Sequence, residues 1–250
     1  MRKLVLLIGL VFVNPAFADI LGARLSGGVF NYSVSGTVRN DPSASNTFDV
    51  KNDLGWKDDH GVMGYLYIEH PIPIIPNIRL GTTSLKLGGT GTVTGTYVYN
   101  GQTFTASDSV TSDLNLSHTE LALYYEVIDT VIDLDVGLNF KFFDGNVTLV
   151  DNTNPATATS SFKETVPMLY GALTIPITGT GFKLAGDIST ISYNNDTITD
   201  YLVRVRYETD FMLGIELGYR SLHIDYEDTG ANKYAKLDMK GPYLMAHLSF

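Results

Sequence analysis

Residues 132–142 read IDLDVGLNFKF, and the alternation in this stretch decides the fold. Apolar side chains fill every second position from Ile132 to Phe142, while two aspartates, a glycine, an asparagine and Lys141 fall between them. Successive side chains of a β-strand point to opposite faces, so a period of two predicts a strand. One face of this strand is apolar and the other is polar.

Two later segments repeat the pattern. Residues 201–208 place tyrosines and valines on one face and Arg204, Arg206 and Glu208 on the other. Residues 213–220 oppose an apolar face to a face that carries Glu216 and Arg220. Neither apolar face carries a charge. A soluble antiparallel sheet can also have one apolar face, so the alternation by itself leaves the surroundings of that face open.

Strand number and connection length point to a membrane barrel. We expect ten strands, at residues 20–38, 61–69, 78–87, 111–127, 131–143, 162–175, 182–193, 201–208, 211–227 and 234–250. Connections after the odd-numbered strands are longer or more polar, and those after the even-numbered strands are mostly tight. An even strand number with periplasmic turns and longer extracellular loops is typical of outer-membrane barrels. The sequence therefore predicts an all-β fold, a single antiparallel transmembrane β-barrel of ten strands with eight as the alternative, and both termini periplasmic.

The first 18 residues have the parts of a secretory signal peptide. Arg2 and Lys3 give a positive region, residues 4–13 are apolar, and Ala16 and Ala18 flank Phe17 as an A-x-A cleavage site. The apolar run is about half of the ~20 residues that a membrane-spanning helix needs. We therefore expect a signal peptide at 1–18 and a barrel domain at 19–250, exported through the secretory pathway.

Composition excludes several classes of protein. The net charge is −10, and removing Arg2 and Lys3 lowers Lys plus Arg from 17 to 15 against 27 Asp plus Glu, which gives −12. This acidity argues against nucleic acid as a partner. The absence of cysteine excludes disulfides, thiolate metal sites and a lipoprotein anchor. Fifteen tyrosines and 12 phenylalanines suit a sheet with aromatic girdles at membrane interfaces, although a soluble secreted β-protein could share this composition.

The C-terminal segment alternates up to a final phenylalanine. Leu244, Ala246, Leu248 and Phe250 share one face of the last expected strand. A strand of this kind resembles the terminal strand by which bacterial outer-membrane barrels are recognised for assembly. We therefore predict that these four residues form an assembly signal. The expected partners are the barrel assembly machinery, outer-membrane lipid and lipopolysaccharide.

Seven segments spread over most of the chain carry a wider resemblance, namely Glu69–Asn77, Asp113–Thr119, Leu123–Val127, Pro167–Gly171, Ile191–Tyr193, Glu216–Ser221 and Gly241–Leu244. As a set they resemble a proteobacterial family of small outer-membrane β-barrel proteins. That family is defined by sequence and has no established activity. The resemblance implies a barrel fold and the outer membrane of a Gram-negative bacterium, and it implies no catalytic residue.

Catalytic and metal-binding patterns are weak. The five histidines lack a short ligand spacing such as H-x-x-x-H. Ser117, His118 and Glu120 could be read as nucleophile, base and orienting acid, but alternation turns Ser117 and His118 to opposite faces. We predict no catalytic residue, metal site or cofactor. The alternatives are a lipid-modifying barrel enzyme, which needs His and Ser or Asp to converge on a lipid-exposed rim, and a soluble periplasmic binding β-barrel.

Charged residues of neighbouring strands are expected to share the inner face of the barrel. They are His118, Glu120, Asp135, Lys141, Arg204, Arg206, Glu208, Glu216 and Arg220. They could form either a plug that neutralises its own charges or a solute-selective constriction. Side chains can fill a barrel of about eight strands, which favours the plug. The predicted function is a non-enzymatic outer-membrane barrel, structural or porin-like, with narrow passage or binding of a small solute.

Deletion of Phe250 tests the assembly signal. We expect the shortened chain to be exported and processed normally but to yield less inserted barrel, because the terminal strand would lose its last apolar side chain. Envelope fractionation and gel mobility before and after boiling would measure folded barrel. Equal amounts of folded barrel with and without Phe250 would contradict the prediction.

Overall fold

A computed structural model describes residues 22–40, 47–194, 196–228 and 233–250. The expected cleavage residues Ala16 and Ala18 lie outside the described residues. Within these ranges the secondary structure consists of fifteen strands. Their bounds are β1 (Gly22–Asn40), β2 (Phe48–Asp49), β3 (Asp59–Glu69), β4 (Asn77–Thr83), β5 (Lys86–Thr92), β6 (Tyr97–Tyr99), β7 (Gln102–Phe104), β8 (Ser109–Asn115), β9 (His118–Asp129), β10 (Asp133–Asp151), β11 (Ala156–Ile177), β12 (Phe182–Tyr193), β13 (Asp196–Glu208), β14 (Leu213–Asp228) and β15 (Lys233–Ser249).

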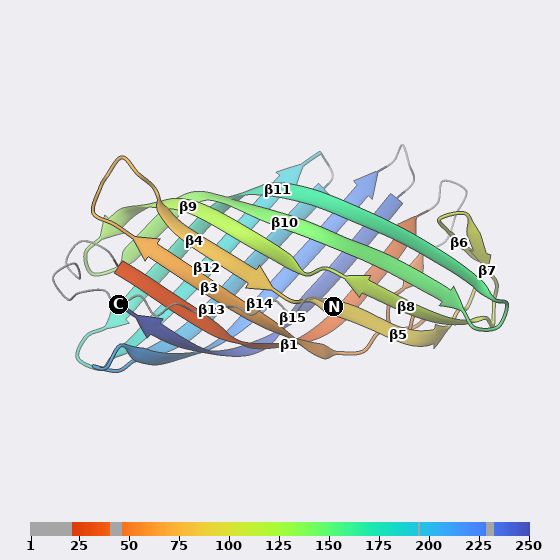
Figure 1. Cartoon of the computed structure of the whole chain (residues 1–250), viewed down its shortest axis with the longest axis horizontal. Helices are drawn as coiled ribbons and strands as arrows, with labels where there is room; N and C mark the ends of the chain where they lie inside the picture. The colour runs from red at the N-terminus through yellow and green to blue at the C-terminus, as the bar shows by residue number, and fades with distance from the viewer. Residues whose placement is uncertain (1–21, 41–46, 195, 229–232) are drawn as a thin grey trace, which may run out of the picture.

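Ten of these strands close into an antiparallel barrel (Figure 1). The order around the wall is β11, β12, β13, β14, β15, β1, β3, β4, β9 and β10, and β10 pairs with β11 to complete the ring. The predicted ten-stranded barrel is therefore confirmed, and the eight-stranded alternative is wrong. The short turns and the C-terminus lie at one end, here called the turn end, and the longer connections lie at the other, the loop end.

Two of the expected strands are interrupted near the middle of the wall. The third is divided into β4 and β5 at Ser84 and Leu85, and the fourth into β8 and β9 at Leu116 and Ser117. Side-chain and backbone hydrogen bonds bridge the break, because the Leu85 N–H donates to the Ser117 hydroxyl at 3.1 Å and the Leu116 N–H donates to the Leu85 carbonyl at 2.8 Å. Both leucines stay buried inside, so the inward and outward alternation continues across the break.

The wall is taller at the loop end than the sequence predicted. Residues 144–161 were expected to form a loop, but β10 runs to Asp151 and β11 starts at Ala156, and the two strands stay paired up to that point. Leu149 and Ala158 from this hairpin are buried in the interior. This burial stabilises strands whose threonines already suit a pleated sheet.

The connections after β1 and β5 fold over the loop end and fill it with apolar side chains. They were predicted as loops, but they contain β2, which pairs with β1, and the β6–β7 hairpin. Phe48 stacks on Tyr97 with ring centroids 4.2 Å apart and meets the edge of Phe104 at 6.0 Å. Together with Val50, Leu54 and Trp56 these residues form a buried cluster, here called the loop-end core.

The outer face of the wall is apolar. Large hydrophobic side chains alternate outward along the strands, as Val203 and Val205 do on β13 and Ile215 and Leu217 do on β14. The intervening Arg204, Arg206 and Glu216 are buried inside. The predicted facing of these two strands is confirmed. The described part of the chain contains no helix long and apolar enough to cross a membrane.

A matched pair of substitutions on β13 tests whether lipid surrounds the wall. Val205 is 43% exposed on the outer face, and its neighbour Arg206 is 3% exposed inside. An arginine on the lipid face near the midplane costs about 2 to 4 kcal/mol. We expect Val205→Arg to lower the free energy of unfolding by that amount in reversible refolding titrations, with Val205→Leu as the neutral control. Arg206→Gln should lower the free energy of unfolding less, since Arg204 remains beside the Glu216 carboxylate that both arginines contact. Equal losses for Val205→Arg and Arg206→Gln would place the outer face in surroundings other than lipid.

Candidate functional site: the charged interior of the barrel

The interior between the two ends carries a network of buried charges. Seven of the nine residues predicted to line the lumen are buried, from β9, β10, β13 and β14, namely His118, Glu120, Lys141, Arg204, Arg206, Glu216 and Arg220. Glu208 and Asp135 are half-buried nearer the turn end. Glu208 accepts a hydrogen bond from Lys183 at 2.9 Å, so it pairs outside this network.

Lys141 joins two carboxylates in the first part of the network. Its ammonium donates to Glu120 and lies 2.8 Å from Asp200 Oδ2. Asp200 also accepts two hydrogen bonds from Arg220, at 3.0 Å from Nε and 2.7 Å from Nη2. Arg220 is held in turn by the Thr83 hydroxyl at 2.9 Å, across the interior on β4. Lys141 thus lies between carboxylates from β9 and β13, and Arg220 is held by Asp200 on β13 and Thr83 on β4.

Asp187 is the centre of the second part. Arg204 donates to both of its carboxylate oxygens, at 2.8 and 2.9 Å, in the bidentate geometry that makes arginine pairs strong. Arg79 donates to Asp187 at 3.2 Å and to Glu120 at 2.9 Å. Arg79 therefore connects the second part of the network to the first.

The third part has more positive groups than carboxylates. Glu216 Oε2 lies 3.2 Å from Arg204 Nε, and Glu216 Oε1 lies 3.4 Å from Arg206 Nε and 3.6 Å from His247 Nδ1. Arg206 Nε and both ring nitrogens of His247 have no hydrogen-bond partner among the described residues. This is the least satisfied part of the charged interior.

Sequence reasoning missed three members of the network, Arg79, Asp187 and Asp200. Arg79 lies between Ile78 and Leu80, a short alternating signal that could have placed it inside. Asp187 interrupts a weakly alternating segment next to Gly186. Asp200 was assigned to a loop, but β13 begins earlier, at Asp196. Sequence reasoning also missed His247 of the terminal strand, which lies 3.6 Å from the Glu216 carboxylate.

The network has the properties of a plug. Its partners come from β4, β9, β10, β12, β13 and β14, so it crosses the interior from wall to wall. Charges removed from water must be paired, and breaking one such buried pair is strongly destabilising. Ions that entered would meet side chains already bound to each other.

The loop-end core is a second closure, with its own polar anchor. Asp53 accepts hydrogen bonds from the Thr94 hydroxyl at 2.7 Å and the Tyr97 hydroxyl at 3.1 Å. Burial raises the pKa of the Asp53 carboxyl, but the hydrogen bonds from Thr94, Tyr97 and the Asp49 N–H outweigh burial and hold the pKa below its ordinary value. Trp56 donates to the Ser112 hydroxyl at 2.6 Å, which fixes the core to β8. Because its pKa lies below the ordinary value of a carboxyl, Asp53 is ionised at neutral pH.

One cluster in the network has the residue types of a metal site. His118, Glu120 and Asp200 offer ligand atoms within 4.8 Å of one another. The carboxylates are already bound to Lys141, Arg79 and Arg220, and His118 Nε2 lies 3.4 Å from Arg220 Nη2. Three cationic side chains surround the position that an ion would take, so the arrangement does not fit a metal cation.

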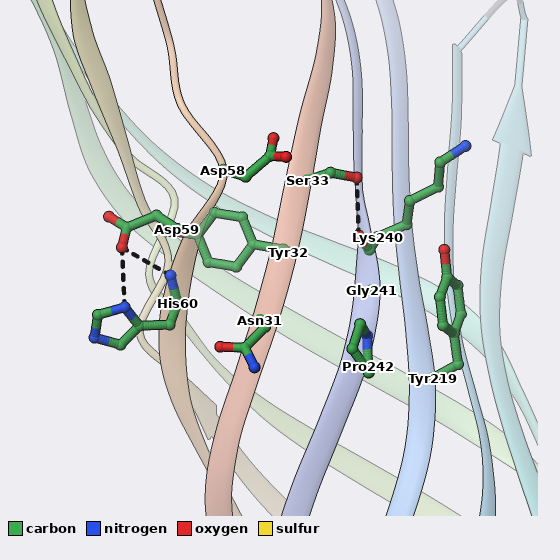
Figure 2. A pocket seen from close by; sticks show the side chains of 10 residues that line it. All are labelled: Asn31, Tyr32, Ser33, Asp58, Asp59, His60, Tyr219, Lys240, Gly241 and Pro242. Atoms are coloured by element: carbon green, nitrogen blue, oxygen red, sulfur yellow. Dashed lines mark hydrogen bonds and ion pairs between the residues drawn. The ribbon is translucent and has the colours of Figure 1, made fainter.

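A hollow of about 570 Å³ opens between β1, β3, β14 and β15 and tests the enzyme alternative (Figure 2). Its lining includes Ser33, Asp59 and His60, the residue types of a nucleophile, an acid and a base. The Ser33 hydroxyl donates to the Lys240 carbonyl at 3.1 Å, on the β15 side. The His60 ring faces the other way, where its Nδ1 lies 3.1 Å from Asp59 (Figure 2). The serine and histidine therefore do not form a nucleophile and base pair.

A second hollow, of about 440 Å³, lies beside the strand breaks and includes Ser117 and His118. The Ser117 hydroxyl accepts the Leu85 N–H, and His118 Nδ1 lies 2.9 Å from the Leu116 carbonyl. Neither group contacts the other. The two residues hold the local backbone instead.

No family model matches the chain, and no curated protein matches it. Among solved structures, the toluene transporter TodX of P. putida is 9% identical with a TM-score of 0.31, over 92% of this chain and 90% of the transporter. The toluene transporter TbuX of Ralstonia pickettii is 13% identical with a TM-score of 0.34, over 93% of this chain and 64% of the transporter. Similarity at this level assigns neither a substrate nor a role.

Removal of the Lys141 charge tests the plug. Lys141→Met leaves Glu120 and Asp200 buried with less compensation, and breaking a buried pair costs about 3 to 5 kcal/mol. Lys163→Met is the matched control, because Lys163 lies 3.5 Å from Asp144 with both side chains exposed. Both variants are compared in reversible refolding titrations, and we expect Lys163→Met to change the free energy of unfolding by at most about 0.5 kcal/mol. Equal effects would show that the interior ion pairs are solvated.

Proposed function

We propose that this chain is an integral outer-membrane β-barrel of a Gram-negative envelope, without enzymatic activity, whose lumen is closed by side chains. The observation that carries the proposal is the combination of an apolar outer wall with an ion-pair network buried across the interior. A soluble barrel would present the polar face to water and the apolar face to its core, and here the two faces are reversed.

The proposed location also rests on the sequence. The signal at 1–18 supports secretory export, and the terminal strand supports recognition by the barrel assembly machinery. Leu244, Ala246, Leu248 and Phe250 are all exposed on the outer face of the last strand, where an assembly factor or lipid could contact them. Lipopolysaccharide is the proposed neighbour at the loop end. Membership of the proteobacterial family of small outer-membrane barrels is part of the same proposal.

Narrow passage or binding of a small solute is the second candidate function. The third part of the network favours it, because Arg204 and Arg206 share the Glu216 carboxylate and the Nε atoms of both have no hydrogen-bond partner among the described residues. A plug yields first where its charges are least compensated. Passage would then depend on transient opening near Glu216.

Single-barrel recordings in planar bilayers test closure. We expect wild-type protein to show no steady conductance, and Glu216→Gln to raise the frequency of brief openings and to lower stability, since Arg204 and Arg206 lose their shared counter-charge. Glu164→Gln, at an exposed position on β11, is the matched control and should behave as wild type. Steady porin-sized conductance of the wild type would refute the plug.

Lipid hydrolysis is measured on the same refolded sample to test the enzyme alternative. We expect no release of fatty acid from phospholipid or lipopolysaccharide. Hydrolysis that Ser33→Ala abolishes would contradict the proposal and assign the first hollow as an active site.

A further inference from the structure

The connection between β3 and β4 is an apolar loop that the function proposed above does not use. Residues 70–76 read HPIPIIP and form the longest connection at the turn end within the described chain. Ile74 is 86% exposed, and Ile72 and Ile75 are each about half exposed. From Pro71 to Pro76 the loop carries no charge.

Internal bonds hold the loop in shape. The His70 N–H donates to Asn77 Oδ1 at 3.0 Å, which closes the base of the loop. The Ile75 N–H donates to the Ile72 carbonyl at 3.2 Å, which forms a turn at the tip. Three prolines restrict the backbone further. The isoleucines are therefore displayed by an ordered loop and are not buried by it.

A tyrosine fastens the tip of this loop to the outside of the wall. The Tyr125 hydroxyl donates to the Ile74 carbonyl at 3.1 Å. Tyr125 faces outward from β9 and is paired with Val136, another exposed apolar residue of the outer face. The adjoining β9–β10 turn exposes Val131. Figure 1 shows this loop beside β4 and β9 at the turn end, where it extends beyond the ends of the strands.

We propose that residues 71–76 insert into the periplasmic leaflet of the outer membrane and anchor the turn end of the barrel there, an inference that rests on the proposed outer-membrane location. Continuity with the apolar wall selects lipid as the occupant. The backbone also suits lipid, because three prolines remove N–H donors and Tyr125 satisfies the Ile74 carbonyl. A loop that served to bind a periplasmic protein would not need to be fastened to the outer, apolar side of the wall.

A single cysteine reports the surroundings of the loop, because the chain has none of its own. Ile74→Cys is labelled with an environment-sensitive fluorophore and reconstituted into vesicles of phosphatidylethanolamine and phosphatidylglycerol. We expect blue-shifted emission, quenching by nitroxide-labelled lipid and protection from iodide. Thr178→Cys, in the polar turn between β11 and β12, should give the opposite result. Tyr125→Phe should shift the Ile74 label toward water while the barrel keeps its gel mobility shift on boiling.

Leu217→Cys on the outer wall separates failure of this inference from failure of the proposed location. Lipid quenching at Leu217 with an iodide-accessible label at Ile74 would overturn the loop anchor and leave the membrane barrel intact. Iodide access at Leu217 in folded protein would overturn both. Lipid quenching at both positions, with Thr178 in water, is the expected result.

Discussion

Closure of the wall by the ladder between β1 and β15 is the constraint on which the rest of the structure depends. A wall whose outer face is apolar offers its backbone groups no water, so each of them must pair within the sheet, and an open edge would leave a row unpaired. The first and last wall strands pair from Arg24 with Ser249 to Asn40 with Lys233. Ala23 and Phe250 exchange two further backbone hydrogen bonds, so pairing extends to the final residue. The backbone groups along the facing edges of β1 and β15 are therefore paired only when both strands have joined the wall.

Closure at ten strands then determines the chemistry of the interior. The space is narrow enough for long side chains from distant strands to meet, as Arg79 on β4 meets Asp187 on β12. A charge in such a space has little water to stabilise it, so each cation needs a carboxylate from another strand. Alternation therefore does two things in each strand. It turns valine, leucine and tyrosine outward, and it supplies the arginines and acids that fill the centre.

The sequence predicted those features that a single strand encodes in itself. Residues 201–208 and 213–220 revealed their facing because all of their charged residues fall on one face and the other face is apolar. The strand β12 was predicted with its observed bounds. Features that depend on packing between distant segments were not predictable in the same way. Phe48 and Tyr97 lie in segments whose sequence is typical of polar loops. In the structure the two rings stack inside the barrel, and their segments form the short strands β2 and β6. Asp200 was missed for a related reason, because its inward direction is set by a strand that starts within an expected loop.

The two closures differ in the physical force that holds them, and this decides how the barrel could open. The loop-end core is mainly apolar, so its stability depends on how tightly Phe48, Trp56 and their neighbours pack. The ion-pair network is anchored to six wall strands and cannot move as a unit without leaving charges unpaired. A solute that displaced the loop-end core would still meet Lys141 and Arg220, both bound to the buried carboxylate of Asp200. Complete opening would require movement of the segment that carries Asp53 and local exchange of partners around Glu216, and loss of the Glu216 charge lowers the second of these barriers. The second change needs no displacement of a wall strand, so it leaves the barrel wall intact.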